Sequence, residues 1–309
     1  MTEPLVYLNS RMVPASQACL TIYDAGIVLG ATVSEQTRTF GKKLFRLDDH
    51  LDRLFRSLQI VGLEIGLTRE ELAQTSQELA AHNAAGLEDW DDLGLCHFVT
   101  AGEIPVYAGS QPARSRPTIC AHTYPLPFGQ WAKKIQFGTH LITPSIRQVP
   151  PESIDPHMKC RSRMHYYLAD KEVRTADSEA SALLLDLAGN VTETSTANFL
   201  MTEEGQIVSP YASTTLPGIS RVMVIELAAK LGIRFVERNL RVPDVLRASE
   251  AFLSSTGFCL MPVTRLNAVP IADGKPGPMF RRVIDAWSQE VGIDIERQIV
   301  DGAQRRQST

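Results

Sequence analysis

A proline- and glycine-rich break near the middle of the chain constrains the fold more than any other local feature. Residues 124–130 read Y-P-L-P-F-G-Q, and proline interrupts helices and central strands because it lacks a backbone N–H donor. Strand-like and helix-like apolar patterns alternate on both sides of the break. A chain of 309 residues is also long for a single core. We therefore expect an α/β (α+β) protein with a smaller N-terminal domain at 1–125, a linker at 126–133 and a larger C-terminal domain at 134–309.

The apolar periodicity and the turn residues predict the elements of both domains. Strands are expected at 5–9, 12–13, 32–40, 44–46, 96–100, 117–122, 134–143, 182–186, 198–201, 234–236 and 250–254. Helices are expected at 47–58, 68–83, 161–175, 220–231 and 276–290. The helix at 68–83 opens with T-R-E-E, a capping-box pattern. The polar tail at 301–309 is expected to be disordered.

Charge and cysteine usage exclude several classes of function. The net charge of −4 argues against nucleic-acid and membrane-surface partners, which select basic patches. No apolar run approaches 18 residues, and Met1 is not followed by a secretory leader, so neither a membrane span nor export is expected. The five cysteines are scattered without a C-x-x-C pair. That pattern predicts a reducing, cytoplasmic location and no structural metal.

Three short segments in the second half carry residue types that could work together. Lys159 lies in D-P-H-M-K-C-R-S-R, Glu193 lies in V-T-E-T-S-T-A-N-F, and residues 216–221 read L-P-G-I-S-R. They provide an amine for a Schiff base, a carboxylate to hold a pyridinium, and a helix start to hold a phosphate. Taken singly, each has a plainer explanation, namely a surface lysine, a solvated turn acid and a Pro-Gly turn with a serine cap.

The order and spacing of these segments resemble the class IV (fold type IV) aminotransferases, which use pyridoxal 5'-phosphate (PLP). That group includes branched-chain and D-amino-acid aminotransferases and aminodeoxychorismate lyase. The resemblance covers roughly residues 4–292. Its motifs are D-x-G-x-x-x-G at 24–30, H-x-x-R-L at 50–54, G-x-V-x-E-x-x-x-x-N at 189–198, and a strand-end threonine at 256.

The resemblance implies a role for each matching residue. Lys159 would be the catalytic Schiff-base lysine, and Ser34, Arg38 and Gly257 would bind the substrate. The residues expected to bind the cofactor are Arg53, Lys159, Glu193, Leu216, Ile219, Ser220 and Thr256. The family also implies two domains with the cofactor at their interface, a homodimer, and no metal.

Fewer residues distinguish between the branches of the family. V-S-E-Q-T-R at 33–38 matches the branched-chain pattern V-x-E-x-x-R. Ala101 stands where D-amino-acid enzymes and the lyase usually carry arginine. Against the branched-chain interpretation, the small polar Ser34 replaces a bulky aromatic residue. Met164 stands where a tyrosine normally contacts the phenolate oxygen of the cofactor, and Tyr166 or Tyr167 would replace it only with a different helix register.

The implied function is a PLP-dependent transaminase with a ping-pong Schiff-base mechanism. It would move an amino group between an amino acid, best a branched-chain L-amino acid, and a 2-oxo acid. Alternatives of the same fold are aminodeoxychorismate lyase, a D-amino-acid transaminase and an R-selective amine transaminase. A catalytically silent member of the family is the non-enzyme alternative.

Overall fold

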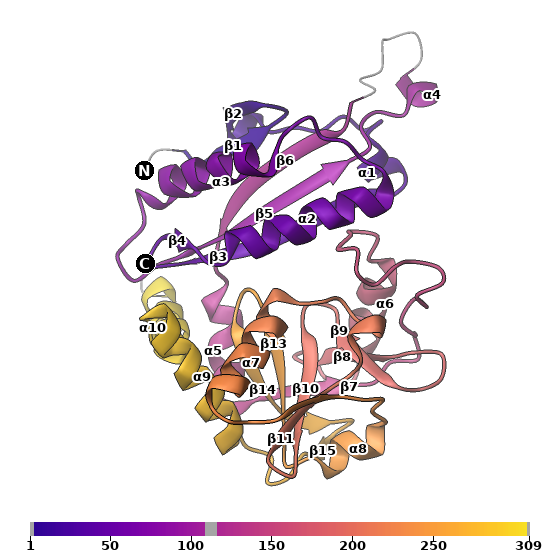
Figure 1. Ribbon diagram of the computed structural model, residues 1–309, viewed down its shortest axis with the longest axis vertical. Helices are drawn as coiled ribbons and strands as arrows, with labels where there is room; N and C mark the ends of the chain where they lie inside the picture. The colour runs from indigo at the N-terminus through magenta and orange to yellow at the C-terminus, as the bar shows by residue number, and fades with distance from the viewer. Residues whose placement is uncertain (1–2, 109–115, 308–309) are drawn as a thin grey trace. The chain divides into compact units, whose positions relative to one another are not determined.

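The computed structural model describes residues 3–108 and 116–307 and divides the chain into two compact units (Figure 1). Unit 1 contains Met1–Leu126 and the short segment Met158–Ser162, and unit 2 contains Pro127–His157 and Arg163–Thr309. Within the described ranges, no helix has the length and hydrophobicity needed to cross a bilayer.

Unit 1 is built on a six-stranded antiparallel sheet with the strand order β2-β1-β6-β5-β3-β4. Its strands are β1 (Leu5–Leu8), β2 (Arg11–Pro14), β3 (Thr32–Phe40), β4 (Lys43–Leu44), β5 (Leu93–Thr100) and β6 (Thr118–Pro125). The hairpin predicted at the N-terminus is confirmed as β1 and β2. The predicted strands at 32–40, 96–100 and 117–122 are confirmed as β3, β5 and β6, with β5 beginning three residues earlier than expected.

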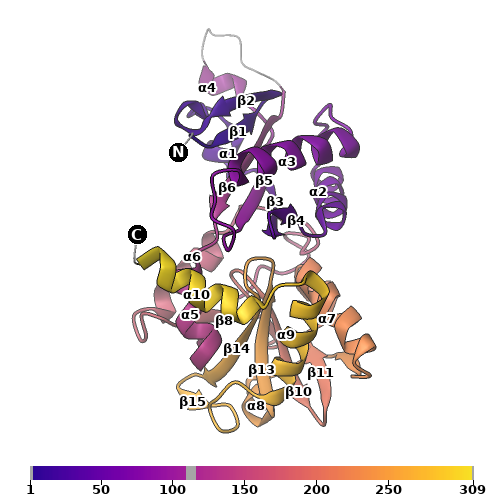
Figure 2. The same cartoon turned by 90° about the vertical axis from the view of Figure 1, so that its left-hand side faces the viewer.

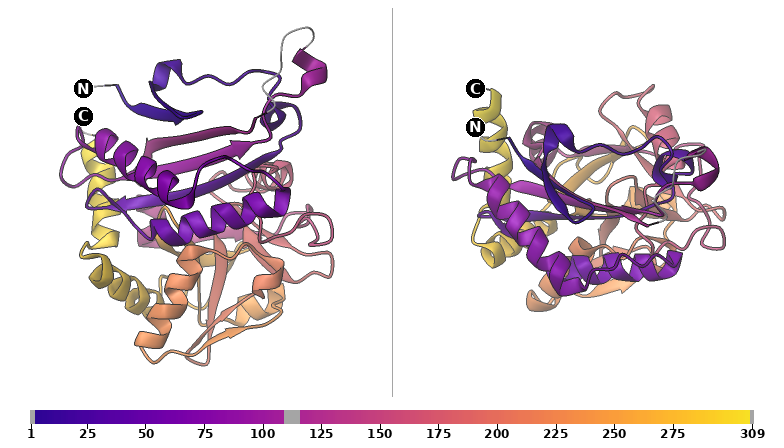
Figure 3. Two further views of the ribbon diagram at one scale, coloured as in Figure 1. Left: turned by 45° about the horizontal axis from the view of Figure 1, so that its top comes forward. Right: turned by 90° about the horizontal axis from the view of Figure 1, so that it is seen from above.

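Two long helices, α2 (Leu47–Val61) and α3 (Arg69–Ala84), pack on the sheet of unit 1 (Figures 1 and 3). The short helices of this unit are α1 (Ala25–Val28) and α4 (Pro105–Ala108). Leu51, Leu54 and Leu58 recur on the inner face of α2 and join a core with the sheet and α3. The predicted capping box of α3 is confirmed. This packing fixes which side chains of α2 face β3.

The segment 158–162 joins unit 1 by pairing with the open edge of β3. The N–H of Ser34 donates to the carbonyl of Lys159 (2.8 Å), and the N–H of Arg161 donates to the carbonyl of Thr32 (2.8 Å). β4 pairs only with the far end of β3, at Thr39 and Phe40, so the near end has room for this segment. The backbone of Lys159 is therefore held by the sheet of unit 1.

Unit 2 contains a nine-stranded mixed sheet. Its strands are β7 (Thr139–Ile142), β8 (Ser181–Leu185), β9 (Val191–Thr194), β10 (Asn198–Glu203), β11 (Gln206–Ser209), β12 (Phe235–Glu237), β13 (Glu250–Ser255), β14 (Cys259–Leu266) and β15 (Val269–Pro270). The order is β12-β11-β10-β13-β14-β7-β8-β9, and β9 also pairs with β10 through Glu193 and Asn198. That pairing closes β10, β13, β14, β7, β8 and β9 into a ring, and it lies at the predicted carboxylate.

Helices surround the sheet of unit 2, and Figure 2 shows α7 and α9 against it. They are α5 (Phe128–Phe137), α6 (Met164–Val173), α7 (Ile219–Lys230), α8 (Val242–Arg247), α9 (Pro278–Val291) and α10 (Ile295–Gln307). Gly232 follows α7 in the left-handed conformation (φ +67°), which confirms the glycine predicted just beyond that helix.

Two predictions for unit 2 are wrong. Residues 134–137, expected as the start of a strand, belong to α5, which also occupies most of the stretch expected as a linker. The tail from residue 301 is helical as far as residue 307, and residues 308–309 lie outside the described part. Ile295, Ile299 and Ala303 recur every four residues on α10 and are buried. That apolar stripe packs the tail against α5.

Candidate cofactor site

Unit 1 contains a buried ion pair between Arg53 of α2 and Glu35 of β3. The Arg53 Nε lies 2.8 Å from Glu35 Oε2, and its Nη2 lies 2.6 Å from Oε1. His50, one turn earlier on the same helix, places Nδ1 3.0 Å from Glu35 Oε1. Burial opposes ionisation of Glu35, but the charge of Arg53 and the hydrogen bonds from Arg53 and His50 outweigh it, so its pKa lies well below the usual range.

The two aspartates nearest to Arg53 in the sequence of α2 pair with other arginines. Asp52 pairs with Arg69 (2.5 Å), and Asp49 pairs with Arg46 (2.5 Å). Arg53 faces the sheet because it is on the inner side of α2, where it is 3% exposed. Its guanidinium is therefore held in one orientation by Glu35.

Lys159 is held at its backbone next to this cluster. The hydroxyl of Ser57 accepts from the N–H of Lys159 (3.1 Å) and donates to the carbonyl of Arg53 (2.9 Å). The positive charge of Lys159 contributes to lowering the pKa of His50, where burial is the larger cause. Burial raises the pKa of the Cys96 thiol, against the charges of Arg161 and Lys159. The charge of Lys159 is thus close enough to act on side chains of unit 1.

Glu193 lies in unit 2 at the junction that closes the ring of strands. Its Oε1 accepts from the Tyr166 hydroxyl (2.9 Å), and its Oε2 accepts from the Asn198 side-chain amide (3.0 Å). The backbone N–H of Leu216 lies 3.3 Å from Oε2 and 3.4 Å from Oε1. Gln148 Nε2 lies 3.5 Å from Oε1. The carboxylate is 7% exposed, and these four donors are neutral.

Strand register brings the other predicted residues of unit 2 to the same edge. Asn198 pairs with Glu193 on one side and with Ser254 of β13 on the other. The Ser255 hydroxyl donates to the carbonyl of Thr196 in the β9–β10 turn (2.8 Å). Thr256 and Gly257 follow directly after β13. A Cβ at Gly257 would lie 2.8 Å from the Trp131 ring, so glycine is required for this close packing.

The helix α7 begins beside the same carboxylate. Asn198 donates its amide to the carbonyl of Leu216 (2.9 Å) as well as to Glu193. Gly218 is the N-cap residue, and the N-cap position of α7 makes no side-chain capping hydrogen bond. The N–H groups of Ile219 and Ser220 therefore stand at an uncapped helix start, which favours an anion.

The residues of unit 2 fit both charged parts of PLP. A carboxylate that accepts hydrogen bonds from neutral donors suits a protonated ring nitrogen, and the start of α7 suits a phosphate dianion. A Cβ at Gly218 would come within 2.0 Å of Asn198 Oδ1. The turn can thus approach Asn198 only because residue 218 is glycine.

Ser34 and Arg38, predicted to bind substrate, lie on β3 in unit 1. Both are buried, and Arg38 stacks over the Phe40 ring at 4.0 Å and donates from Nε to the carbonyl of Thr39 (3.0 Å). The structure brings Arg53 and Lys159 together in unit 1. It brings Glu193, Leu216 and the start of α7 together in unit 2, with Thr256 and Gly257 at the same strand ends. The roles of all these residues stay predictions.

Tyr166 belongs to this cluster, although the sequence alone does not predict which way its side chain points. Met164 (68% exposed) and Tyr167 (63% exposed) of the same helix are on the solvent side. Tyr166 is instead held by Glu193 and by Gln148, whose Nε2 lies 2.8 Å from the phenol oxygen. Residue 164, where the family usually carries a tyrosine, is methionine in this chain. The family pattern therefore does not predict the contact of Tyr166 with Glu193.

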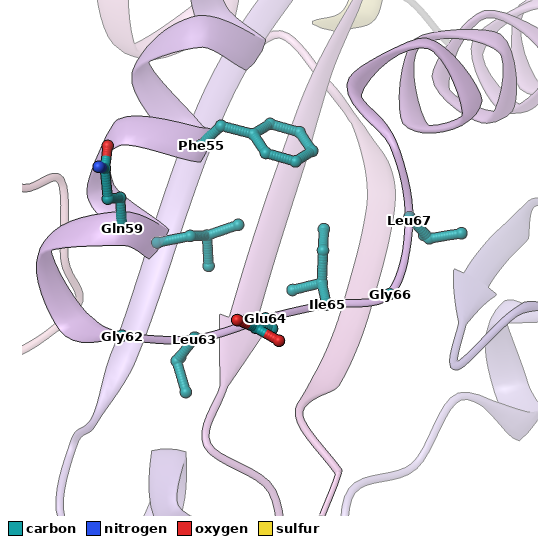
Figure 4. A pocket seen from close by; sticks show the side chains of 9 residues that line it. Phe55, Gln59, Gly62, Leu63, Glu64, Ile65, Gly66 and Leu67 are labelled. Atoms are coloured by element: carbon teal, nitrogen blue, oxygen red, sulfur yellow. The ribbon is translucent and has the colours of Figure 1, made fainter.

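A separate pocket lies at the end of α2 in unit 1 (Figure 4). It is lined by Phe55, Leu58, Gln59, Gly62, Leu63, Glu64, Ile65, Gly66 and Leu67. Several of these apolar side chains also pack on the core of the unit. Its lining, taken from the described residues, contains no residue predicted for the cofactor site.

Known proteins resemble this chain along most of its length. It is 27% identical over 297 residues to branched-chain-amino-acid aminotransferase-like protein 1 of Arabidopsis thaliana, covering 94% of this chain and 52% of the relative. The chain thus spans about half the length of that plant protein. It is 28% identical over 289 residues to D-alanine aminotransferase of Bacillus licheniformis, covering 93% of this chain and 96% of the relative.

A solved structure has the same fold. The branched-chain amino acid aminotransferase of Thermobaculum terrenum in its PLP form matches with a TM-score of 0.82 and 22% identity, over 96% of each chain. The family model for class IV aminotransferases matches residues 32–266, which is more than half of the chain and includes both the lysine and the carboxylate segments. The chain therefore belongs to the class IV aminotransferase family.

Proposed function

We propose that this protein is a PLP-dependent transaminase that moves an amino group between a branched-chain L-amino acid and a 2-oxo acid by a ping-pong mechanism. The observation that carries the proposal is Glu193, a buried carboxylate held by neutral donors beside the uncapped start of α7. When bound, PLP withdraws electrons from the bonds at the substrate Cα.

The chain's own residues would supply binding and proton transfer. Lys159 would hold the cofactor through its amine and, once displaced by the substrate amine, would move a proton at the substrate Cα. Glu193 would keep the ring nitrogen protonated. Leu216 would pack against one face of the ring.

Main-chain and side-chain groups would bind the phosphate. Ile219 and Ser220 would provide backbone N–H groups, and Thr256 would add a hydroxyl. Arg53 would contribute a guanidinium whose orientation is set by Glu35, since a fixed planar fork suits a phosphate. A loss of Arg53 would therefore weaken cofactor retention more than it would slow the chemistry.

Two observations favour a branched-chain L-amino acid as the donor. Glu35 and Arg38 occupy the matching positions of the pattern V-x-E-x-x-R on β3, and Ala101 removes the arginine typical of D-amino-acid enzymes and the lyase. Ser34, Arg38 and Gly257 would contact the substrate. The plant relative, which is 27% identical, is also named as branched-chain-amino-acid aminotransferase-like.

A D-amino acid is the second candidate. The D-alanine aminotransferase of Bacillus licheniformis matches this chain over 96% of its own length, which is more than the plant relative does. Ser34 and Gln36 are also more polar than the apolar walls that hold branched side chains. The substrate test must therefore include D-alanine.

Absorption spectroscopy of the purified protein with PLP tests the proposal. We expect a visible band that is lost on addition of L-leucine and restored by a 2-oxo acid. Bleaching by D-alanine instead would transfer the assignment to D-amino acids, bleaching by a primary amine would indicate an amine transaminase, and pyruvate release without an acceptor would indicate the lyase.

The variant Lys159→Ala should lose the visible band and at least 1,000-fold of the turnover, because it removes the nucleophile and the proton carrier together (roughly that scale for such residues). Lys133→Ala, which changes an exposed lysine, is the matched control and should behave as the unmodified protein. Retained exchange in Lys159→Ala would refute the proposal.

We further propose that the protein is a cytoplasmic homodimer, as the family resemblance implies. Light scattering of the purified protein would give twice the mass of one 34.1 kDa chain. A monomer that retains full turnover would refute the dimer without affecting the assigned chemistry.

A further inference from the structure

Tyr166 occupies the centre of a hydrogen-bonded chain that ends on Glu193. Its hydroxyl lies 2.9 Å from Glu193 Oε1 and accepts from Gln148 Nε2 at 2.8 Å. The backbone of Gln148 is itself anchored to β8, since its N–H donates to the carbonyl of Leu185 (2.9 Å). The phenol is thus fixed from both sides, by β8 through Gln148 and by the ring closure through Glu193.

The helix α6 presents its aromatic residues very differently. Tyr166 packs partly buried against the cluster of Ala169, Val173 and Ala182, whereas Tyr167 is 63% exposed. The hydroxyl of Tyr166 is used by the carboxylate and by Gln148. It therefore contacts the carboxylate that we expect at the ring nitrogen.

We propose that Tyr166 is a positioning residue, which holds Glu193 ionised and in a fixed orientation so that this carboxylate can bind a protonated ring nitrogen. This inference rests on the proposed function of Glu193. A hydrogen bond to a carboxylate stabilises its charged form, and a neutral donor does so without cancelling the charge. Gln148 donates to the phenol at 2.8 Å and also lies 3.5 Å from Glu193 Oε1.

The electrostatics of Tyr166 agree with a permanent donor. Burial raises the pKa of Tyr166 well above its ordinary value of 10, and the negative charge of Glu193 raises it further. The hydrogen bond from Gln148 and the charge of Arg163, which lies 5.0 Å from the ring centroid, act in the opposite direction. The phenol consequently keeps its proton at neutral pH and donates it to Glu193.

Alkaline absorbance titration of the cofactor-free protein tests the contact without PLP. Burial also raises the pKa of Tyr124, to about 12, so two of the seven tyrosines should ionise late. We expect the late ionisation of Tyr166 to disappear in Tyr166→Phe and to persist in Tyr167→Phe. In Glu193→Gln, this late ionisation should move to lower pH, because the negative charge that opposes it is gone. An unchanged titration in Glu193→Gln would overturn the inference, even if Tyr166→Phe failed to fold.

Cofactor affinity and kinetics test the consequence. Tyr166→Phe should bind PLP roughly 10-fold more weakly, the scale of a hydrogen bond to a charged group, and should lower kcat more than it changes KM for the amino donor. Tyr167→Phe is the matched control. In the Glu193→Gln background, Tyr166→Phe should add less than about a twofold effect, because the two side chains act as one unit.

The outcomes separate this inference from the proposed function. PLP binding by the unmodified protein with equal affinity in Tyr166→Phe would overturn the positioning role and leave the transaminase assignment standing. Failure of the unmodified protein to bind PLP would refute the proposed function. The alkaline titration would then still decide whether Tyr166 and Glu193 are coupled.

Discussion

Each unit contains a buried carboxylate, and different kinds of group stabilise the two carboxylates. Glu35 of unit 1 faces a guanidinium in a two-point ion pair and a histidine. Glu193 of unit 2 accepts from a phenol, an amide and a backbone N–H. Arg53 compensates the charge of Glu35, whereas the phenol, the amide and the backbone N–H that donate to Glu193 are neutral groups.

The difference indicates separate tasks for the two acids. A carboxylate paired with arginine orients that arginine and contributes to the structure of its own unit. A carboxylate held by dipoles can still attract a cation such as a protonated ring nitrogen. Variants at each site should therefore produce different losses, of folding stability in unit 1 and of cofactor binding in unit 2.

The largest effect is expected for Glu35→Ala. It leaves Arg53 as a buried charge without its carboxylate partner, which costs about 3–5 kcal/mol of folding stability. Urea unfolding followed by circular dichroism would measure the loss. The double variant Glu35→Gln/Arg53→Gln should lose less than Glu35→Ala, because no net charge stays buried. A loss below about 1 kcal/mol in Glu35→Ala would contradict this account of the pair.

The second largest effect is the loss of folding stability of unit 1 at acidic pH. His97 places Nε2 2.7 Å from the Ser76 hydroxyl, and burial lowers its pKa from 6.5 to about 4. Between those values the unfolded chain binds a proton that the folded protein does not, so stability is full above pH 6.5 and falls as the pH drops toward 4. The expected loss is about 3 kcal/mol.

Urea unfolding at several values between pH 7 and pH 4 would show this loss, and His97→Gln should flatten the curve. His50, whose pKa burial also lowers, would keep part of the slope. Equal slopes for the unmodified protein and His97→Gln would show that His97 does not titrate in this window.

A smaller effect is expected for Gly218→Ala in unit 2. The new Cβ would come within 2.0 Å of Asn198 Oδ1, so Asn198 must shift from Glu193 and Leu216. Overpacking of this kind costs about 1–3 kcal/mol, and PLP affinity should fall with it. Gly129→Ala in α5, where the new Cβ would meet open space, is the control. Unchanged PLP affinity in Gly218→Ala would separate Asn198 from the cofactor site.

The smallest effect is expected for Glu179→Ala, which removes an exposed ion pair with Lys133 (3.1 Å). Solvent screens this pair, so the loss should stay below about 1 kcal/mol. Measured beside Glu35→Ala, it shows how much of that larger loss is due to burial. A loss as large as that of Glu35→Ala would mean that burial is not the decisive factor.

The predictions that succeeded depend on local patterns. The helices α2 and α7 follow from apolar spacing, and the capping box at Thr68 and the glycine after α7 follow from single residue types with one strong preference. Such features are determined within a few residues and can be read from one sequence.

The errors and omissions depend on contacts between distant segments. The prediction of a disordered tail considered only the residues from 301 onward. The apolar stripe of α10 begins earlier, at Ile295, and it packs on α5. The partnership of Glu35 with Arg53 requires β3 and α2 to lie together. Tyr166 meets Glu193 only because α6 packs beside the ring of strands. None of these contacts leaves a local signal.

The segment 158–162 has a consequence for how this protein can be divided. The chain passes from one unit to the other after Leu126, after His157 and after Ser162, so no single cut separates the units. A fragment that ends at residue 126 lacks the strand-like partner that covers the near end of β3. Recombination between relatives would therefore have to exchange two pieces at once to keep Lys159 with its own sheet, which makes this fold a poor candidate for modular exchange of its domains.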